Sequence, residues 1–213
     1  MIKTIKKNEE TEITVKKSTF IANIFRVDSE EEAKEKIKNI CKKYFDAKHN
    51  CYAYRILKQE EDRTTEITKF SDNKEPQGTA GGQILEVIKN SQLYNVIIVV
   101  TRYFGGILLG TGGLSRAYSE SSQKVVQKAE VLKQTIGNEY IIKCGYEDQN
   151  EILYELKKQS IKIKNTEYKE KIEITISISK ENIELLNKIE ELKYKTKDKI
   201  EIILSKQNEI MDI

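Results

Sequence analysis

Residues 96–118 read VIIVVTRYFGGILLGTGGLSRAY, and this stretch carries most of the information about the fold. Its first five residues are all β-branched and apolar, which predicts a central strand buried on both faces. Five glycines follow within residues 105–113. From Leu114 onward, apolar side chains recur at helical spacing. The stretch therefore predicts a strand, a glycine-rich turn and a long helix.

The rest of the first half alternates strands and helices around this unit. Ser29 followed by three glutamates is a helix-start signature, with Ser29 as N-cap and Glu32 at the third helical position. Short β-branched and aromatic runs predict further strands, and the charged residues 58–69 predict an exposed hairpin or loop. We expect strands at 13–15, 20–27, 50–57 and 94–103, and helices at 30–44, 84–90 and from Leu114.

The second half has a different composition. Eight of the ten glycines lie between Gly78 and Gly113, and no glycine or proline follows Gly145. We expect strand 139–146, helix 148–159, strands 161–168 and 171–179, helix 181–192 and strand 199–204. This β-α-β-β-α-β order is that of the ferredoxin-like fold. The sequence thus predicts an α+β protein with an N-terminal domain at 1–135 and a C-terminal domain at 136–213.

Composition excludes several kinds of chemistry. The chain of 213 residues has one histidine and three cysteines, at 41, 51 and 144. One histidine rules out an HExxH zinc site, and the cysteine spacing contains no CxxC pair. We therefore expect no metal and no cofactor. Sparse free thiols, no apolar run of membrane-spanning length and no secretion signal predict a cytoplasmic protein with no membrane partner.

The glycine-rich turn is the first candidate site. Between Asn90 and Ser119 there is no acidic residue, and the only charges are Arg102 and Arg116. Free N–H groups at a helix start bind phosphate or carboxylate readily. We predict anion or nucleic-acid contacts from Arg102 and Arg116, stacking on Tyr103, and backbone donors at Gly105, Gly106, Gly110, Gly112 and Gly113. The alternative is that the glycines permit tight packing and the arginines form structural pairs.

Residues 70–82 form a second candidate loop, which contains the only proline. Asp72 and Glu75 could act as paired carboxylates for acid–base or metal chemistry. Thr79 could cap the helix that follows. The alternative is an ordered surface turn, because Asp, Asn, Pro and Gly are turn formers.

His49 and Cys51 would share one face of a strand, so they could pair as base and thiol. A nucleophile usually lies at a loop or helix start, whereas a cysteine within a strand more often packs in the core. We regard packing as the better interpretation.

Four segments resemble the YigZ/IMPACT family: 17–22 (KSTFIA), 49–55 (HNCYAYR), 75–81 (EPQGTAG) and 101–118. The resemblance implies a ribosomal-protein-like α/β fold, similar to domain IV of elongation factor G, followed by a ferredoxin-like domain. Eukaryotic members are non-enzymatic translational regulators. Leu108 departs from the family, which frequently has a basic residue there.

The sequence favours a non-enzymatic binding protein associated with translation through RNA, the ribosome or a translation-linked protein. Its support is the acid-free glycine and arginine segment in a first half of net charge +5. The alternative is an enzyme acting on a phosphorylated small molecule or nucleotide at the same helix start. The oligomeric state is left open.

Overall fold

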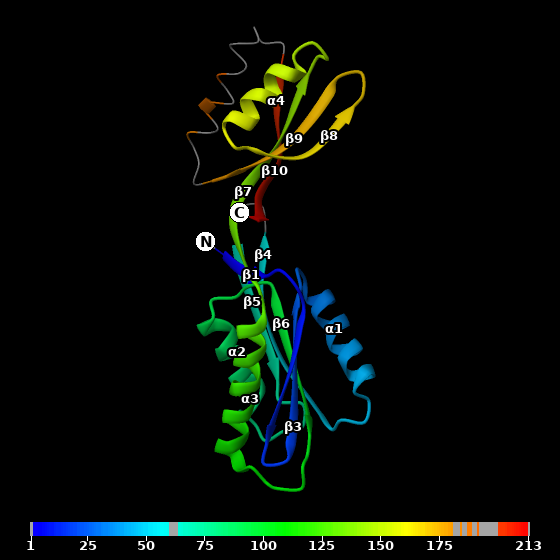
Figure 1. The fold of residues 1–213 in the computed structure, drawn as a ribbon, viewed down its shortest axis with the longest axis vertical. Helices are drawn as coiled ribbons and strands as arrows, with labels where there is room; N and C mark the ends of the chain where they lie inside the picture. Colours follow the sequence, from blue (N-terminus) through cyan, green and yellow to red (C-terminus); the bar gives the residue numbers. More distant parts are fainter. Residues whose placement is uncertain are drawn as a thin grey trace. The chain divides into compact units, whose positions relative to one another are not determined.

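The computed structural model describes residues 2–59, 64–180 and 200–212, together with 184, 187, 188 and 191. The chain divides into two compact units, Ile2–Lys133 and Gln134–Ile213. The predicted α+β fold with two domains is confirmed (Figure 1). The expected boundary after residue 135 lies two residues beyond this division. No described helix is both long enough and apolar enough to cross a bilayer.

The first unit is built on an antiparallel sheet with the strand order β2-β3-β6-β4-β5. Strand β6 occupies the centre, and seven of its eight residues are buried, so the predicted central strand is confirmed. Short strand β1 precedes the sheet and bridges to Leu93 through Lys3. The strands are β1 (Ile2–Ile5), β2 (Glu9–Val15), β3 (Ser18–Arg26), β4 (His49–Gln59), β5 (Thr64–Ser71) and β6 (Val96–Tyr103).

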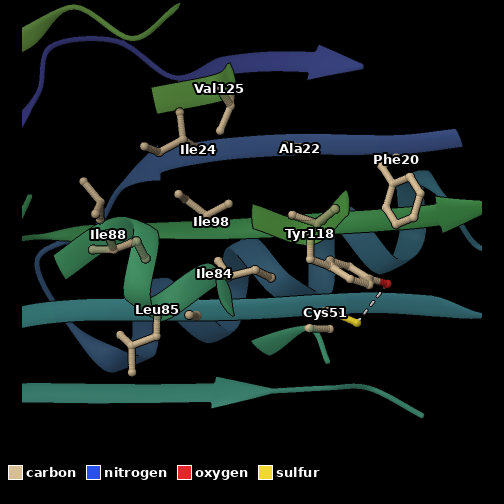
Figure 2. Close-up of a cluster of buried hydrophobic side chains, with 14 of the residues drawn as sticks. Phe20, Ala22, Ile24, Cys51, Ile84, Leu85, Ile88, Ile98, Tyr118 and Val125 are labelled. Carbon is tan, nitrogen blue, oxygen red and sulfur yellow. Dashed lines mark hydrogen bonds between the residues drawn. The ribbon is translucent and has the colours of Figure 1, made fainter. Parts of the chain in front are cut away.

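Alternate residues of β6 face two separate cores. Ile97 and Val99 pack with α1 (Glu30–Lys43) on one face of the sheet. Ile98 and Val100 pack with α2 (Gly81–Asn90) and α3 (Gly110–Lys128) on the other. Figure 2 shows this second core, with Phe20, Ile84 and Tyr118 meeting over the sheet.

The helix starts differ from the predictions in an informative way. Ser29 caps α1 as expected, since its side chain accepts a hydrogen bond from the Glu32 N–H at 3.2 Å. However, α2 begins three residues before the predicted Ile84, and α3 begins four residues before Leu114. The first turns of both helices contain glycine, which carries no apolar periodicity, so the pattern could not reveal them.

Strand β7 (Val131–Cys144) begins with the last three residues of the first unit and continues into the second, which also contains α4 (Gln149–Lys158), β8 (Lys162–Tyr168), β9 (Ile172–Ser179) and β10 (Glu201–Asp212). Strand β7 pairs with β9 and β10, and β9 pairs with β8, all antiparallel. Ile152 and Leu156 of α4 pack on the isoleucines of β9. The helix expected at 181–192 lies largely outside the described residues. The last strand is longer than the predicted 199–204.

Candidate functional site

Four connections of the first unit lie at the same end of its sheet. The β2–β3 turn, the start of β4 and the end of β6 are neighbours, because Thr19 pairs with Tyr103 and His49 pairs with Arg102. Tyr52 in turn pairs with Ser71, the last residue of β5. We call this region the loop end, and it comprises residues 16–17, 44–48, 72–80 and 104–109, with the first turn of α2 and the first two turns of α3 (Figure 1).

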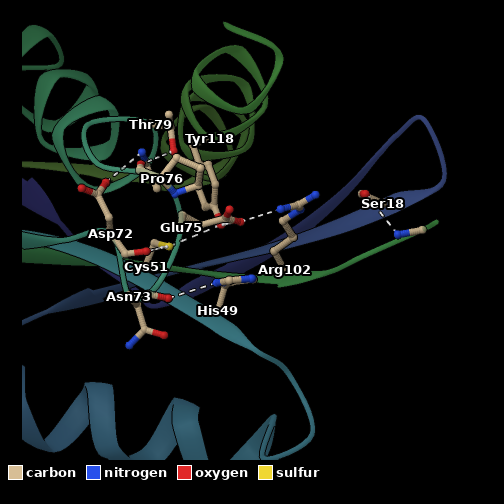
Figure 3. Close-up of polar contacts among 12 residues, drawn as sticks. Ser18, His49, Cys51, Asp72, Asn73, Glu75, Pro76, Thr79, Arg102 and Tyr118 are labelled. Atoms are coloured by element: carbon tan, nitrogen blue, oxygen red, sulfur yellow. Dashed lines mark hydrogen bonds and ion pairs between the residues drawn. The ribbon is translucent and has the colours of Figure 1, made fainter. Parts of the chain in front are cut away.

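A buried ion pair lies at the base of the loop end. Arg102 Nη1 donates to Glu75 Oε1 at 2.7 Å, and the two side chains are 7% and 3% exposed. Tyr118 Oη, on α3, donates to the same carboxylate oxygen at 2.9 Å. The guanidinium lies 5.6 Å from the rings of both Phe20 and Phe104. Figure 3 shows how β6, α3 and the 72–80 loop converge on Glu75.

This geometry brings Arg102 together with Glu75 and not with Arg116. The positive charge of Arg102 is balanced within the protein, as the structural-pair alternative anticipates. Its Nε is buried with no hydrogen-bond partner among the described residues. Tyr118, an aromatic residue of the glycine segment, is fully buried and therefore offers no stacking surface. Burial raises the pKa of its hydroxyl, and the neighbouring Cys51 and Glu75 add to this shift.

Asp72 caps the N-terminus of α2, whereas Thr79 does not. Asp72 Oδ1 accepts from the N–H groups of Ala80 and Gly81 at 3.0 and 2.8 Å. Its Oδ2 accepts from Gly78 N–H at 2.8 Å, so Asp72 caps α2 from a distance. Thr79 Oγ1 instead donates to Pro76 O at 2.7 Å. Asp72 and Glu75 thus have separate partners and do not form a carboxylate pair.

His49 and Cys51 also have separate partners. Cys51 Sγ lies 2.9 Å from Asp72 O and 3.3 Å from Tyr118 Oη. His49 Nδ1 is 3.0 Å from Asn73 O, a carbonyl that can only accept, so this nitrogen carries the proton. Burial raises the pKa of the Cys51 thiol to about 12. A thiol–imidazole nucleophile is therefore unsupported, because such a cysteine needs a lowered pKa.

Within the glycine turn, Gly105 is required for packing. Its N–H donates to Ser18 Oγ at 3.1 Å, and a Cβ at this position would lie 2.0 Å from the Lys17 backbone. Gly106 and Gly110 adopt φ values of +85° and +72°, which other residues rarely tolerate. Gly112 and Gly113 lie inside the first turn of α3.

Tyr103 is half-buried and already hydrogen-bonded. Its hydroxyl donates to Asp46 Oδ1 at 2.6 Å, and this bond raises the pKa of Tyr103 to about 12. Its ring meets Tyr44 edge to face. The ring therefore helps to fix the α1–β4 connection, and its stacking role stays a prediction.

The N-terminus of α3 lacks a side-chain cap and has no acidic residue in its first turn. Arg116, in the second turn, is exposed. It has no ion pair with Glu120 in the described structure, and Lys124 donates to Glu12 O instead. The backbone N–H groups of the first turn and the Arg116 charge are both open to a ligand.

The charges of the loop end are unbalanced. Each of its acidic side chains has a partner: Asp46 accepts from Tyr103, Asp72 caps α2 and Glu75 pairs with Arg102. Its exposed cations, by contrast, have no ion pair within the described part of the chain. These cations are Lys16, Lys17, Lys48, Lys74 and Arg116. The five cations outnumber the three carboxylates, so the region carries a net positive charge.

Exposed apolar side chains gather at the same end, a feature that the sequence did not reveal. Leu108 is 83% exposed, and Phe104 and Ile107 are 54% and 42% exposed. Phe45 and Phe70 are exposed in or beside neighbouring connections. The available signal was the Ile107–Leu109 run, which interrupts the glycines without helical or strand periodicity. No cluster of metal-ligating side chains occurs among the described residues.

Comparison with known proteins identifies the family to which the chain is similar. Residues 16–126 match the family model for the Impact N-terminal domain, and residues 142–188 match a domain of unknown function, DUF1949. The IMPACT family member YvyE of Bacillus subtilis is 39% identical over 170 residues, which cover 80% of this chain and 76% of YvyE. The chain belongs to the IMPACT family.

Other IMPACT family members are also similar in sequence to this chain. YigZ of Escherichia coli is 34% identical over 154 residues, which cover 72% of this chain and 74% of YigZ. Mouse protein IMPACT is 39% identical over 100 residues, or 46% of this chain and 30% of the mouse protein. A solved structure titled as that of a hypothetical protein has a TM-score of 0.64 and 27% identity, and covers 95% of this chain and 96% of its own.

Proposed function

We propose that this protein is a non-enzymatic regulator in translation that holds a negatively charged partner at the loop end. One observation carries the proposal: the acidic groups of this end are engaged within the protein, whereas five exposed cations are not. The uncapped N-terminus of α3 adds a partial positive charge at the same place. The ribosome, which is rich in phosphate, is the first partner to test.

The translational context comes from the family. Mouse protein IMPACT is 39% identical to this chain over 100 residues. Eukaryotic members of the family are translational regulators, and the shared sequence motifs are the reason for extending that role to this chain. A cytoplasmic location follows as part of the same proposal.

The alternative of an enzyme is less well supported by the site. The groups that could act as a base or nucleophile are engaged in structural hydrogen bonds. Glu75 is held by Arg102 and Tyr118, and the pKa of Cys51 is raised to about 12. His49 uses Nδ1 to hold the 72–80 loop through Asn73. A binding function needs only the surface of the loop end, and the hydrogen bonds of these buried groups hold that surface in place.

The test is co-sedimentation with purified ribosomes at low and moderate salt. The key variant is Lys16→Glu/Lys17→Glu/Arg116→Glu, since these three side chains are exposed and unpaired. The matched control, Lys7→Glu/Lys38→Glu/Lys89→Glu, makes the same change in net charge away from the loop end. We expect salt-sensitive binding in wild type and control, and its loss in the loop-end variant. Equal binding by both variants would overturn the proposal.

A further inference from the structure

We infer that the partner contacts the loop end with a protein segment that carries both acidic and apolar side chains. This inference rests on the proposed function and names the chemistry of the partner. Its basis is the apolar crest, which we define as Phe104, Ile107 and Leu108, together with the cations beside it.

The crest is not an ordinary scatter of surface residues. In the described part of the first unit, six large apolar side chains are exposed, and five of them lie at or beside the loop end. They are Phe45, Phe70, Phe104, Ile107 and Leu108, whereas Val131 lies elsewhere. Three of them, Phe104, Ile107 and Leu108, lie within five consecutive residues of one connection, and exposed apolar side chains that lie together mark a surface that another molecule covers.

The crest is also held in position from below. Gly105 packs directly on the Lys17 backbone and is hydrogen-bonded to Ser18. Leu109 packs against the core under α3, and the Phe104 ring lies against the Arg102 guanidinium. The loop therefore presents Ile107 and Leu108 outward on a fixed base. A partner would lose little free energy in ordering such a surface.

Charge complementarity selects the occupant. The Lys17 backbone lies against Gly105, between the crest residues, and Lys16 precedes it in the β2–β3 turn. Arg116 lies on the helix that follows the crest. None of the three has an ion pair among the described residues. A segment whose apolar side chains cover the crest would place carboxylates opposite these cations and the first turn of α3.

Nucleic acid would contact the cations of this surface but would leave its aliphatic side chains uncovered. Bases stack on flat aromatic or guanidinium groups, whereas Ile107 and Leu108 are aliphatic. Of the aromatic residues in the segment, Tyr118 is buried and Tyr103 is half-buried and hydrogen-bonded, which leaves Phe104 with an exposed ring. Leu108, the most exposed residue of the crest, would remain in water against an RNA backbone. A protein segment buries it.

The inference is tested by fluorescence anisotropy with defined probes on the full chain. Two 16-residue peptides of Leu and Glu place the leucines on one helix face or in alternation, and a third scrambles the order. A 16-nucleotide RNA is the fourth probe. We expect at least one of the two patterned peptides to bind at least tenfold more tightly than either the scrambled peptide or the RNA. Leu108→Ser should weaken that binding at least tenfold, and the exposed control Val131→Ser should not.

Tighter binding of RNA, no binding of either patterned peptide, or unchanged binding by Leu108→Ser would overturn the inference. The ribosome experiment separates this failure from that of the proposed function. If ribosome binding is lost in the Lys16, Lys17 and Arg116 variant but no peptide binds, the anion-binding surface stands and only the partner chemistry is wrong. If ribosomes and peptides both fail to bind, both proposals fail.

Discussion

Arg102 and Arg116 differ in environment although both flank the glycine turn. Arg102 is buried against Glu75, whereas Arg116 is exposed with no described ion pair. A mutation of Arg102 therefore acts first on stability, and only a mutation of Arg116 reports cleanly on binding. This difference is why the binding tests leave Arg102 unchanged.

The buried pair can be tested by removing one charge. Glu75→Gln leaves the Arg102 charge uncompensated in the core, so we expect a loss of about 3–5 kcal/mol in the free energy of unfolding. The matched control is Glu130→Gln, which breaks the exposed pair with Lys6 and should cost less than about 1 kcal/mol. Urea denaturation measures both. Equal losses in the two variants would show that Glu75 is not a buried partner.

Cys51 provides a second prediction at this scale. Because burial raises the pKa of its thiol to about 12, the reactive thiolate is scarce at pH 8. We expect iodoacetamide to modify the half-buried Cys41 first and to reach Cys51 only in urea. Peptide mass mapping over time distinguishes the sites. Rapid modification of Cys51 in the native protein would reopen the thiol–imidazole reading.

At the scale of elements, the turn before α3 depends on one close contact. Gly105→Ala would place a Cβ against the Lys17 backbone, and we expect it to cost about 1–3 kcal/mol through overpacking. Gly112→Ala, in the first turn of α3, meets no atom within 4 Å and should be neutral or stabilise by up to about 1 kcal/mol. Thermal unfolding of both variants measures the contrast. A stable Gly105→Ala protein would contradict the packing of the turn.

The sequence predicts elements better than it predicts their contacts. The apolar run at 96–100 identified the central strand, and Ser29 identified the start of α1, because both signals are local. The cap of α2 could not be found in this way. Asp72 lies eight and nine residues before the N–H groups of Ala80 and Gly81, and only the folded loop brings them together.

The same limit applies to the candidate site. Arg102 and Glu75 are 27 residues apart, and their pairing depends on the register of β6 beside β4. Spacing along the chain gave no reason to join them. The exposure of Leu108 was equally hidden, since an apolar residue in a turn is expected to pack. Composition identified the correct segment, and tertiary contacts decide which of its residues face the solvent.

At the scale of the whole molecule, the two units distribute charge differently. In the second unit, Glu139 accepts from Lys164 and Ser205, and Glu173 pairs with Lys143 and Lys169. These lysines are balanced by neighbouring carboxylates, unlike the cations of the loop end. We therefore place the binding surface on the first unit.

An enzyme using nucleotide makes a different prediction. A site for ATP at the start of α3 would stabilise the folded protein in proportion to its occupancy. A ligand shifts the melting temperature only when its concentration exceeds its dissociation constant. Because we assign no nucleotide site to this protein, we expect millimolar ATP with Mg²⁺ to leave the melting temperature unchanged to within about 1 °C. Differential scanning fluorimetry measures this, with ATP lacking Mg²⁺ as the control. A clear Mg²⁺-dependent rise would favour the enzyme.

Hydrogen–deuterium exchange on the full chain, free and bound to ribosomes, tests the central claim most directly. We predict that binding slows exchange in peptides covering residues 16–18 and 104–117, while peptides from β8 and β9 exchange as in the free protein. Slower exchange confined to residues 134–180, with the loop end unchanged, would contradict the account.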